Sequence, residues 1–231
     1  MKKTLIGLSV LVLLVPFVAH AAPLMYVPTG EANDLVIIDL NTGKIAGRMP
    51  GLEIAHGLAA SPNSDYLVAG SMQPVQAGTK SEAVKPAAIS EAEHAAHHAA
   101  GPQESAAGTP GYVSTPSYVS IVHPKHGHVM RRIAVRGLTH HTAVSPDGKY
   151  AIAVHSGAGG ISVIDLQSMI VVKEIQTGRS PNYALFSNNG NFLYVSNTDS
   201  GTVSEIDSRD WRIKRELAVG KEPEHMVAFD H

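Results

Sequence analysis

Histidine is the residue type in this sequence that is best suited to chemistry. The 231 residues include 13 histidines and no cysteine. Without cysteine the chain has no disulfide, no iron–sulfur cluster and no covalently attached c-type haem. A metal ion would therefore be held by imidazole, carboxylate, thioether or backbone donors, and imidazole suits zinc and copper. No G-x-S-x-G, P-loop or dinucleotide-binding motif is present, which favours a protein that is not an enzyme without deciding the question.

Three histidines and one asparagine recur at one position of an internal repeat. Each lies five residues before the residue that is expected to open a turn, which is a serine in three cases and an aspartate in the C-terminal case: His56, His140, Asn182 and His225. We expect these side chains to surround the mouth of a central channel and to converge on one metal ion. His141 adjoins the set, and His155 begins a loop that we expect on the same face. The alternative interpretation is structural, with polar side chains that bond neighbouring loops and channel water.

A second group of histidines lies in an insertion, residues 72–117, that is rich in Ala, Glu, His, Pro, Gly and Ser. Such a composition buries too little apolar surface to order itself. His94, His97 and His98 lie there, and we expect them to act as accessory metal ligands over the same channel mouth. The stretch EHAAH from Glu93 is not the H-E-x-x-H zinc-protease motif, because its glutamate precedes both histidines. His126 and His128 fall in a different turn, which we interpret as solvated.

The elements that position these residues are strands of a repeat about 42 residues long. Three segments superpose without gaps: SPNSDYLVAGS from Ser61, SPDGKYAIAVHS from Ser145 and SNNGNFLYVSNT from Ser187. Each combines a turn signal with an alternating run of β-branched or aromatic residues, which predicts a strand. Two further strands follow in each unit. Short strands at this spacing indicate an all-β fold, a β-propeller of four-stranded antiparallel blades.

The stretches LYVSN from Leu193 and MYVPT from Met25, each followed by a variant of V-x-x-I-D, resemble the YVTN-type repeat of bacterial periplasmic β-propellers. SPDGKY at Ser145 and AVGKEP at Ala218 match that repeat too. The resemblance covers nearly all of residues 24–231 apart from the insertion. It is specific for the fold and weak for function, because propellers serve as binding platforms, haem domains and enzymes. A more distant similarity is to the haem-binding propeller of dissimilatory nitrite reductase.

The two ends of the chain predict how the ring closes. HMVAF from His225 matches the first strand of a blade and LMYV from Leu24 matches the second. We therefore expect four blades in each chain, with the last blade closed by both termini. Two chains that exchange termini to form one eight-bladed ring are the alternative, so the chain is either a monomer or a terminus-exchanged dimer.

The first 21 residues, with Lys2, Lys3, an apolar run and Ala19-His20-Ala21, read as a secretory signal peptide. The mature domain, residues 22–231, is then periplasmic or secreted, and no membrane span remains after cleavage. The chain has 18 basic and 20 acidic residues, which gives no electrostatic footprint for nucleic acid.

Three functions fit these features. The first is a periplasmic binding protein for a divalent transition metal or a metallocofactor, with copper or zinc expected rather than haem. The second is a redox protein, or a haem or copper accessory protein of a respiratory reductase system, which the resemblance implies. The third is a protein-interaction scaffold without a ligand. The sequence identifies no protein partner.

Overall fold

The computed structural model describes residues 23–75 and 115–228 of the chain. The expected signal peptide, most of the expected insertion and the histidines His94, His97 and His98 lie outside these residues. No helix in the described ranges is long and apolar enough to cross a membrane.

The described residues contain fifteen strands in four antiparallel sheets, and each sheet takes its strands from one stretch of the chain. The first sheet contains β1 (Leu24–Pro28), β2 (Asp34–Asp39) and β3 (Lys44–Pro50). The second contains β4 (Ala55–Ala60), β5 (Leu67–Ser71), β6 (Ser117–His123) and β7 (His128–Val135). The third contains β8 (His141–Val144), β9 (Tyr150–His155), β10 (Gly160–Asp165) and β11 (Ile170–Gln176). The fourth contains β12 (Pro181–Phe186), β13 (Phe192–Asn197), β14 (Thr202–Asp207) and β15 (Arg212–Ala218).

The hydrogen-bond registers confirm the repeat. In every sheet the ladder between the last two strands shifts at the same place, at Ile37/Ile38, Ile121/Val122, Val163/Ile164 and Glu205/Ile206. The aspartate that closes the third strand of a unit accepts the backbone N–H two residues on, as Asp165 does from Gln167 at 3.0 Å. Asp39 and Asp207 do the same. These aspartates therefore shape turns, as expected from their positions.

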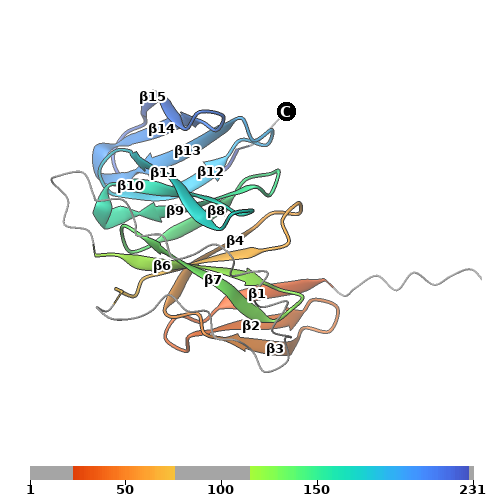
Figure 1. Cartoon of the computed structure of the whole chain (residues 1–231). Helices are drawn as coiled ribbons and strands as arrows, with labels where there is room; N and C mark the ends of the chain where they lie inside the picture. Colours follow the sequence, from red (N-terminus) through yellow and green to blue (C-terminus); the bar gives the residue numbers. More distant parts are fainter. Residues whose placement is uncertain (1–22, 76–114, 229–231) are drawn as a thin grey trace, which may run out of the picture.

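The sheets stack face to face in chain order, with β1–β3 at the bottom of Figure 1 and β12–β15 at the top. Successive side chains of a strand point to opposite faces of its sheet, so one strand can pack against the sheets on both sides. In β9, Ala151 and Ala153 pack toward the second sheet, and Ile152 and Val154 pack toward the fourth. A third apolar cluster, which includes Leu35, Met49 and Val122, joins the first sheet to the second. The buried strands read as continuous apolar runs because both of their faces are covered.

The expected closure of one blade by both termini is not seen among the described residues. The first sheet has three strands, and residues 219–228 form no strand. The C-terminal segment lies at the fourth sheet, and the first and fourth sheets are at opposite ends of the stack (Figure 1). Two short 3-10 turns, η1 (Ser156–Ala158) and η2 (Thr198–Ser200), follow β9 and β13.

Candidate ligand-binding groove

The strand registers place three of the predicted residues at one equivalent position. The first strand of each sheet pairs with the second: Leu58 of β4 with Ala69, Thr142 of β8 with Ala153, and Ala184 of β12 with Val195. Two residues before these lie His56, His140 and Asn182. All three therefore lie at the entry of the first strand of a sheet, β4, β8 or β12, which we call the innermost strands. Of these, β8 contacts both β4 and β12. The predicted equivalence of these three positions is confirmed.

His225 follows a different register from the one predicted. Ser156 Oγ donates to the Pro181 carbonyl at 2.7 Å, and Thr198 Oγ1 donates to the Pro223 carbonyl at 3.0 Å. These two bonds come from equivalent residues after β9 and β13, so Pro223 takes the place of Pro181. His225 then corresponds to Tyr183 and His141, not to Asn182. Counting back from Asp230 misaligned it by one residue, because Asp230 lies seven positions after Pro223, whereas Ser187 lies six after Pro181.

His56 and His140 form a pair at the groove entrance. Their ring centroids are 4.7 Å apart and the rings are tilted by 31°. The Nδ1 of His56 lies 2.9 Å from the His140 carbonyl oxygen. Because a carbonyl oxygen only accepts, Nδ1 carries the proton, and in the neutral ring Nε2 keeps its lone pair. This hydrogen bond to a backbone carbonyl is the arrangement that commonly orients a metal-binding imidazole.

A row of three rings runs beside this pair. His141 stacks on Tyr183 with centroids 4.1 Å apart, and the Tyr183 and His225 centroids are 4.8 Å apart. Burial, and then the neighbouring His225, His140 and His56, lower the pKa of His141 to about 4. His141 is consequently neutral at neutral pH. His140 and His141 are adjacent in the chain, so the pair and the row form one group, which we call the histidine cluster: His56, His140, His141 and His225.

Two polar atoms at this entrance have no hydrogen-bond partner within residues 23–75 and 115–228. His140 Nδ1 and Asn182 Oδ1 are both buried and unpaired, at equivalent positions of neighbouring strands. An unpaired buried polar atom costs free energy and calls for an explanation. Among residues 23–75 and 115–228, however, no three His, Asp or Glu side chains are arranged so that they could hold a metal ion.

His155 stands apart from the histidine cluster. It is fully buried, and its Nε2 lies 2.6 Å from Ser162 Oγ, which donates in turn to Glu174. In the fourth sheet Asn197, Ser204 and Glu216 repeat this chain of bonds. His155 therefore joins strands within its sheet and is not brought to the groove.

The histidines of the β6–β7 turn form a separate group. The His123 and His126 rings are 4.2 Å apart, and those of His126 and His128 are 5.9 Å apart. His126 and Gly127 donate their backbone N–H groups to the His123 carbonyl. His126 is thus located in the expected tight turn, whereas His128 is the first residue of β7, and both lie away from the innermost strands.

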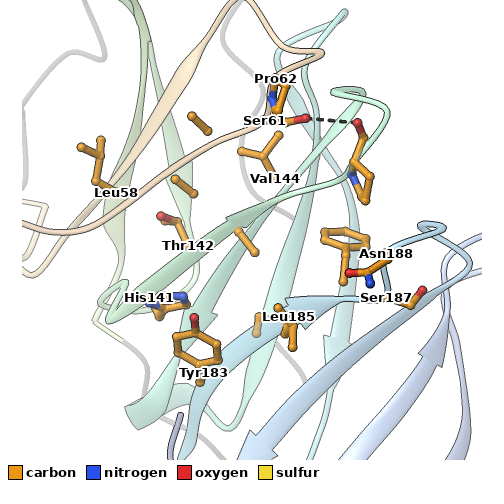
Figure 2. Close-up of a pocket in the computed structure, with 16 residues that line it drawn as sticks. Leu58, Ser61, Pro62, His141, Thr142, Val144, Tyr183, Leu185, Ser187 and Asn188 are labelled. Carbon is orange, nitrogen blue, oxygen red and sulfur yellow. Dashed lines mark hydrogen bonds between the residues drawn. The ribbon is translucent and has the colours of Figure 1, made fainter. Parts of the chain in front are cut away.

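The histidine cluster adjoins a groove along the innermost strands, with a volume of about 540 Å³. Figure 2 shows His141 and Tyr183 at one end and Pro62 and Asn188 at the other. The half-buried side chains of Leu58, Val144 and Leu185 give the floor an apolar character. Ser61 Oγ donates to the Pro146 carbonyl and ties β4 to β8 at the far end. Sequence reasoning did not single out Tyr183 or this floor; the position of Tyr183 directly after Asn182 was the available signal.

Comparison with known proteins establishes the fold and no more. No protein-family model and no curated protein matches the sequence. Among solved structures, the chain is similar to one of the hydrazine synthase of Kuenenia stuttgartiensis, with a TM-score of 0.62 and 18% identity. The fold is that of a β-propeller. The match covers 85% of this chain and 46% of that chain, so this chain spans less than half of that chain's length.

Proposed function

We propose that the chain is a periplasmic propeller protein of the YVTN-repeat type that binds a divalent transition metal, or a small ligand carrying one. The site is the histidine end of the inner groove, and copper or zinc is the expected metal. One observation carries the proposal. His56 is exposed, and its Nδ1–H bonds to the His140 carbonyl, so its Nε2 lone pair is free to bind a metal ion.

The neighbouring donors support the same chemistry. His140 has a buried ring nitrogen without a partner, and His141 is held neutral by burial and by the other histidines. Metal binding requires neutral imidazole, so at neutral pH the His141 ring carries no proton that a metal ion would have to displace. The described donors do not yet surround one point, and we infer that the exposed rings of His56 and His225 rotate to complete the site. His94, His97 and His98 are the accessory donors of this proposal.

The groove favours a ligand with an apolar part over a bare ion as the full occupant. Leu58, Val144 and Leu185 line the floor next to the histidine cluster, within a volume of about 540 Å³. Small-molecule sites typically combine such an apolar lining with a few polar groups at one end. A metal complex with an organic portion would use both halves of the groove.

The test is calorimetric titration of the periplasmically expressed protein with Zn²⁺ and with Cu²⁺. The triple variant His56→Ala, His140→Ala and His225→Ala should lose the tightest site. The fall in metal affinity should exceed the roughly 10–100-fold that results when a residue that only hydrogen-bonds a metal ligand is removed. The matched control is His126→Ala with His128→Ala, which removes imidazoles outside the groove and should leave that site intact.

Binding should also weaken as the pH falls below about 6.5, because protons compete for the imidazole nitrogens. Absorption by the purified protein separates the candidate roles, since a haem or copper chromophore would favour the redox function. An affinity unchanged in the triple variant would overturn the proposal and leave the histidine cluster as loop-bonding residues.

A further inference from the structure

Within the described residues, the edge strand of the first sheet lacks the partner that its counterparts have. There β1 pairs only with β2, whereas β5, β9 and β13 each pair with an innermost strand as well. The register shows that β1 corresponds to those second strands, since Met25 pairs with Ile38 as Leu67 pairs with Val122. The backbone groups along the free edge of β1 are therefore available to one more strand.

The C-terminal segment has the position of an innermost strand without a sheet to join. Pro223 is held by Thr198 as Pro181 is held by Ser156, and Pro181 begins β12 of the next sheet. Ser196 Oγ also donates to the Glu224 carbonyl at 2.6 Å. Beyond these bonds the segment makes no strand pairing among the described residues, and the Val227 side chain is 87% exposed.

The outer face of the first sheet is largely apolar, and no other sheet of the described residues packs on it. Met25 and Ile45 are 43% and 59% exposed, and Val27 and Ile38 are partly exposed beside them. At the same register positions of the second sheet, Leu67, Ala69, Val122 and Val129 are buried against the preceding sheet. A strand edge and an apolar face left free together indicate an interface.

We propose that two copies of this chain assemble head to tail into one ring of eight blades. Each copy adds its C-terminal segment as the innermost strand of the other's first sheet. A head-to-tail contact closes into a ring when its rotation allows, and eight blades is within the usual range of four to eight. Closure within one chain would need the first and fourth sheets to meet, but they lie at opposite ends of the stack (Figure 1).

The fourth sheet presents a face that can meet the first sheet of the second copy. Glu205 is buried there and is bound through both oxygens by Arg215, at 3.0 and 2.6 Å. Because the carboxylate is already paired, covering it leaves no uncompensated charge. The ring would also place His225 of one copy between its own Tyr183 and the partner subunit's His56. The second copy would thereby extend the histidine cluster.

Mass measurement by analytical ultracentrifugation of the exported chain tests the assembly. The expected result is a mass of two chains. Ile45→Asp puts a charge on the free face and should weaken association by about tenfold or more. Val172→Asp is the control, because Val172 is a comparably exposed strand residue on β11, away from both free ends. A single-chain mass at every concentration would overturn the proposal.

Engineered cysteines separate exchange between chains from closure within a chain. The chain has no cysteine of its own. Val27 corresponds to Ala69 and Val195, and Met226 corresponds to Leu58 and Ala184. Because those residues pair with each other, Met226 should lie opposite Val27. Val27→Cys with Met226→Cys should therefore give a covalent dimer on a non-reducing gel, and each single variant should not. A disulfide that closes within one chain would show a four-bladed ring and overturn the exchange.

Discussion

One repeat position carries His155 in the third sheet and Asn197 in the fourth, and both residues take part in the same pattern of hydrogen bonds. Each bonds a serine on the next strand, and that serine bonds a glutamate, Glu174 or Glu216. The difference is that imidazole titrates and amide does not. Burial, and then the Arg136 guanidinium, lower the pKa of His155 to about 3.

The substitution His155→Asn should therefore make stability less dependent on pH. An unfolded histidine takes up a proton below pH 6.5, whereas folded His155 resists protonation down to about pH 3. Its contribution to stability is thus complete above pH 6.5 and is lost as the pH falls. Between pH 7 and pH 5 the loss should be about 2 kcal/mol.

Urea unfolding of the wild type and His155→Asn at these two pH values measures the effect. The variant should lose about 2 kcal/mol less than the wild type on acidification. His126→Asn, at the β6–β7 turn, is the control and should follow the wild type. Equal pH dependence in the wild type and His155→Asn would show that His155 is protonated without cost.

At the scale of strands, β4 and β8 approach each other closely at Gly57. This glycine corresponds to His141 and Tyr183 in the next two sheets. A Cβ at Gly57 would lie 2.9 Å from the Thr142 backbone nitrogen and 3.0 Å from the His141 backbone. Backbone atoms cannot move aside as a flexible side chain can, so β4 and β8 would have to separate.

Gly57→Ala should therefore destabilise the protein by about 1–3 kcal/mol, as overpacking of a dense interior does. It should also disturb His56 and His140, whose bond spans the same two strands. Gly47→Ala is the matched control, since a Cβ there would meet only Ile37 Cδ1 at an ordinary 3.8 Å. Thermal unfolding of both variants measures the difference, and similar melting temperatures would contradict the close approach.

The strands were predictable from the sequence where local pattern decides them. The turn and alternation after Ser145 predicted β9, and the spacing of His56, His140 and Asn182 predicted one shared position. The register of His225 was predicted wrongly, because the count began at Asp230, whereas Thr198 holds the segment at Pro223. The missing strand of the first sheet was not predictable. A segment with the pattern of a strand still needs a partner edge, and the position of that edge is a property of the whole stack.

At the scale of the whole molecule, a stack of repeats gains stability mainly from contacts between neighbouring units. The third sheet has a neighbour on both faces, whereas among the residues that the structure describes the first sheet packs only against the second. The β1–β3 sheet should therefore open most readily in a single chain. In the proposed eight-bladed ring that sheet gains a strand and a second neighbour, so its protection should depend on protein concentration.

Amide hydrogen exchange at two concentrations measures this dependence. Where local opening needs dissociation, a tenfold rise in concentration should slow exchange in β2 by up to about tenfold, because stabilisation by binding grows as RT ln(1 + [L]/Kd). Exchange in β9 should change much less, since its sheet is covered on both faces in either state. Ile45→Asp should remove the concentration effect in β2 and keep the protection of β9. Exchange in β2 that is slow and independent of concentration would mean that the first sheet is already covered within one chain, and the head-to-tail ring would be wrong.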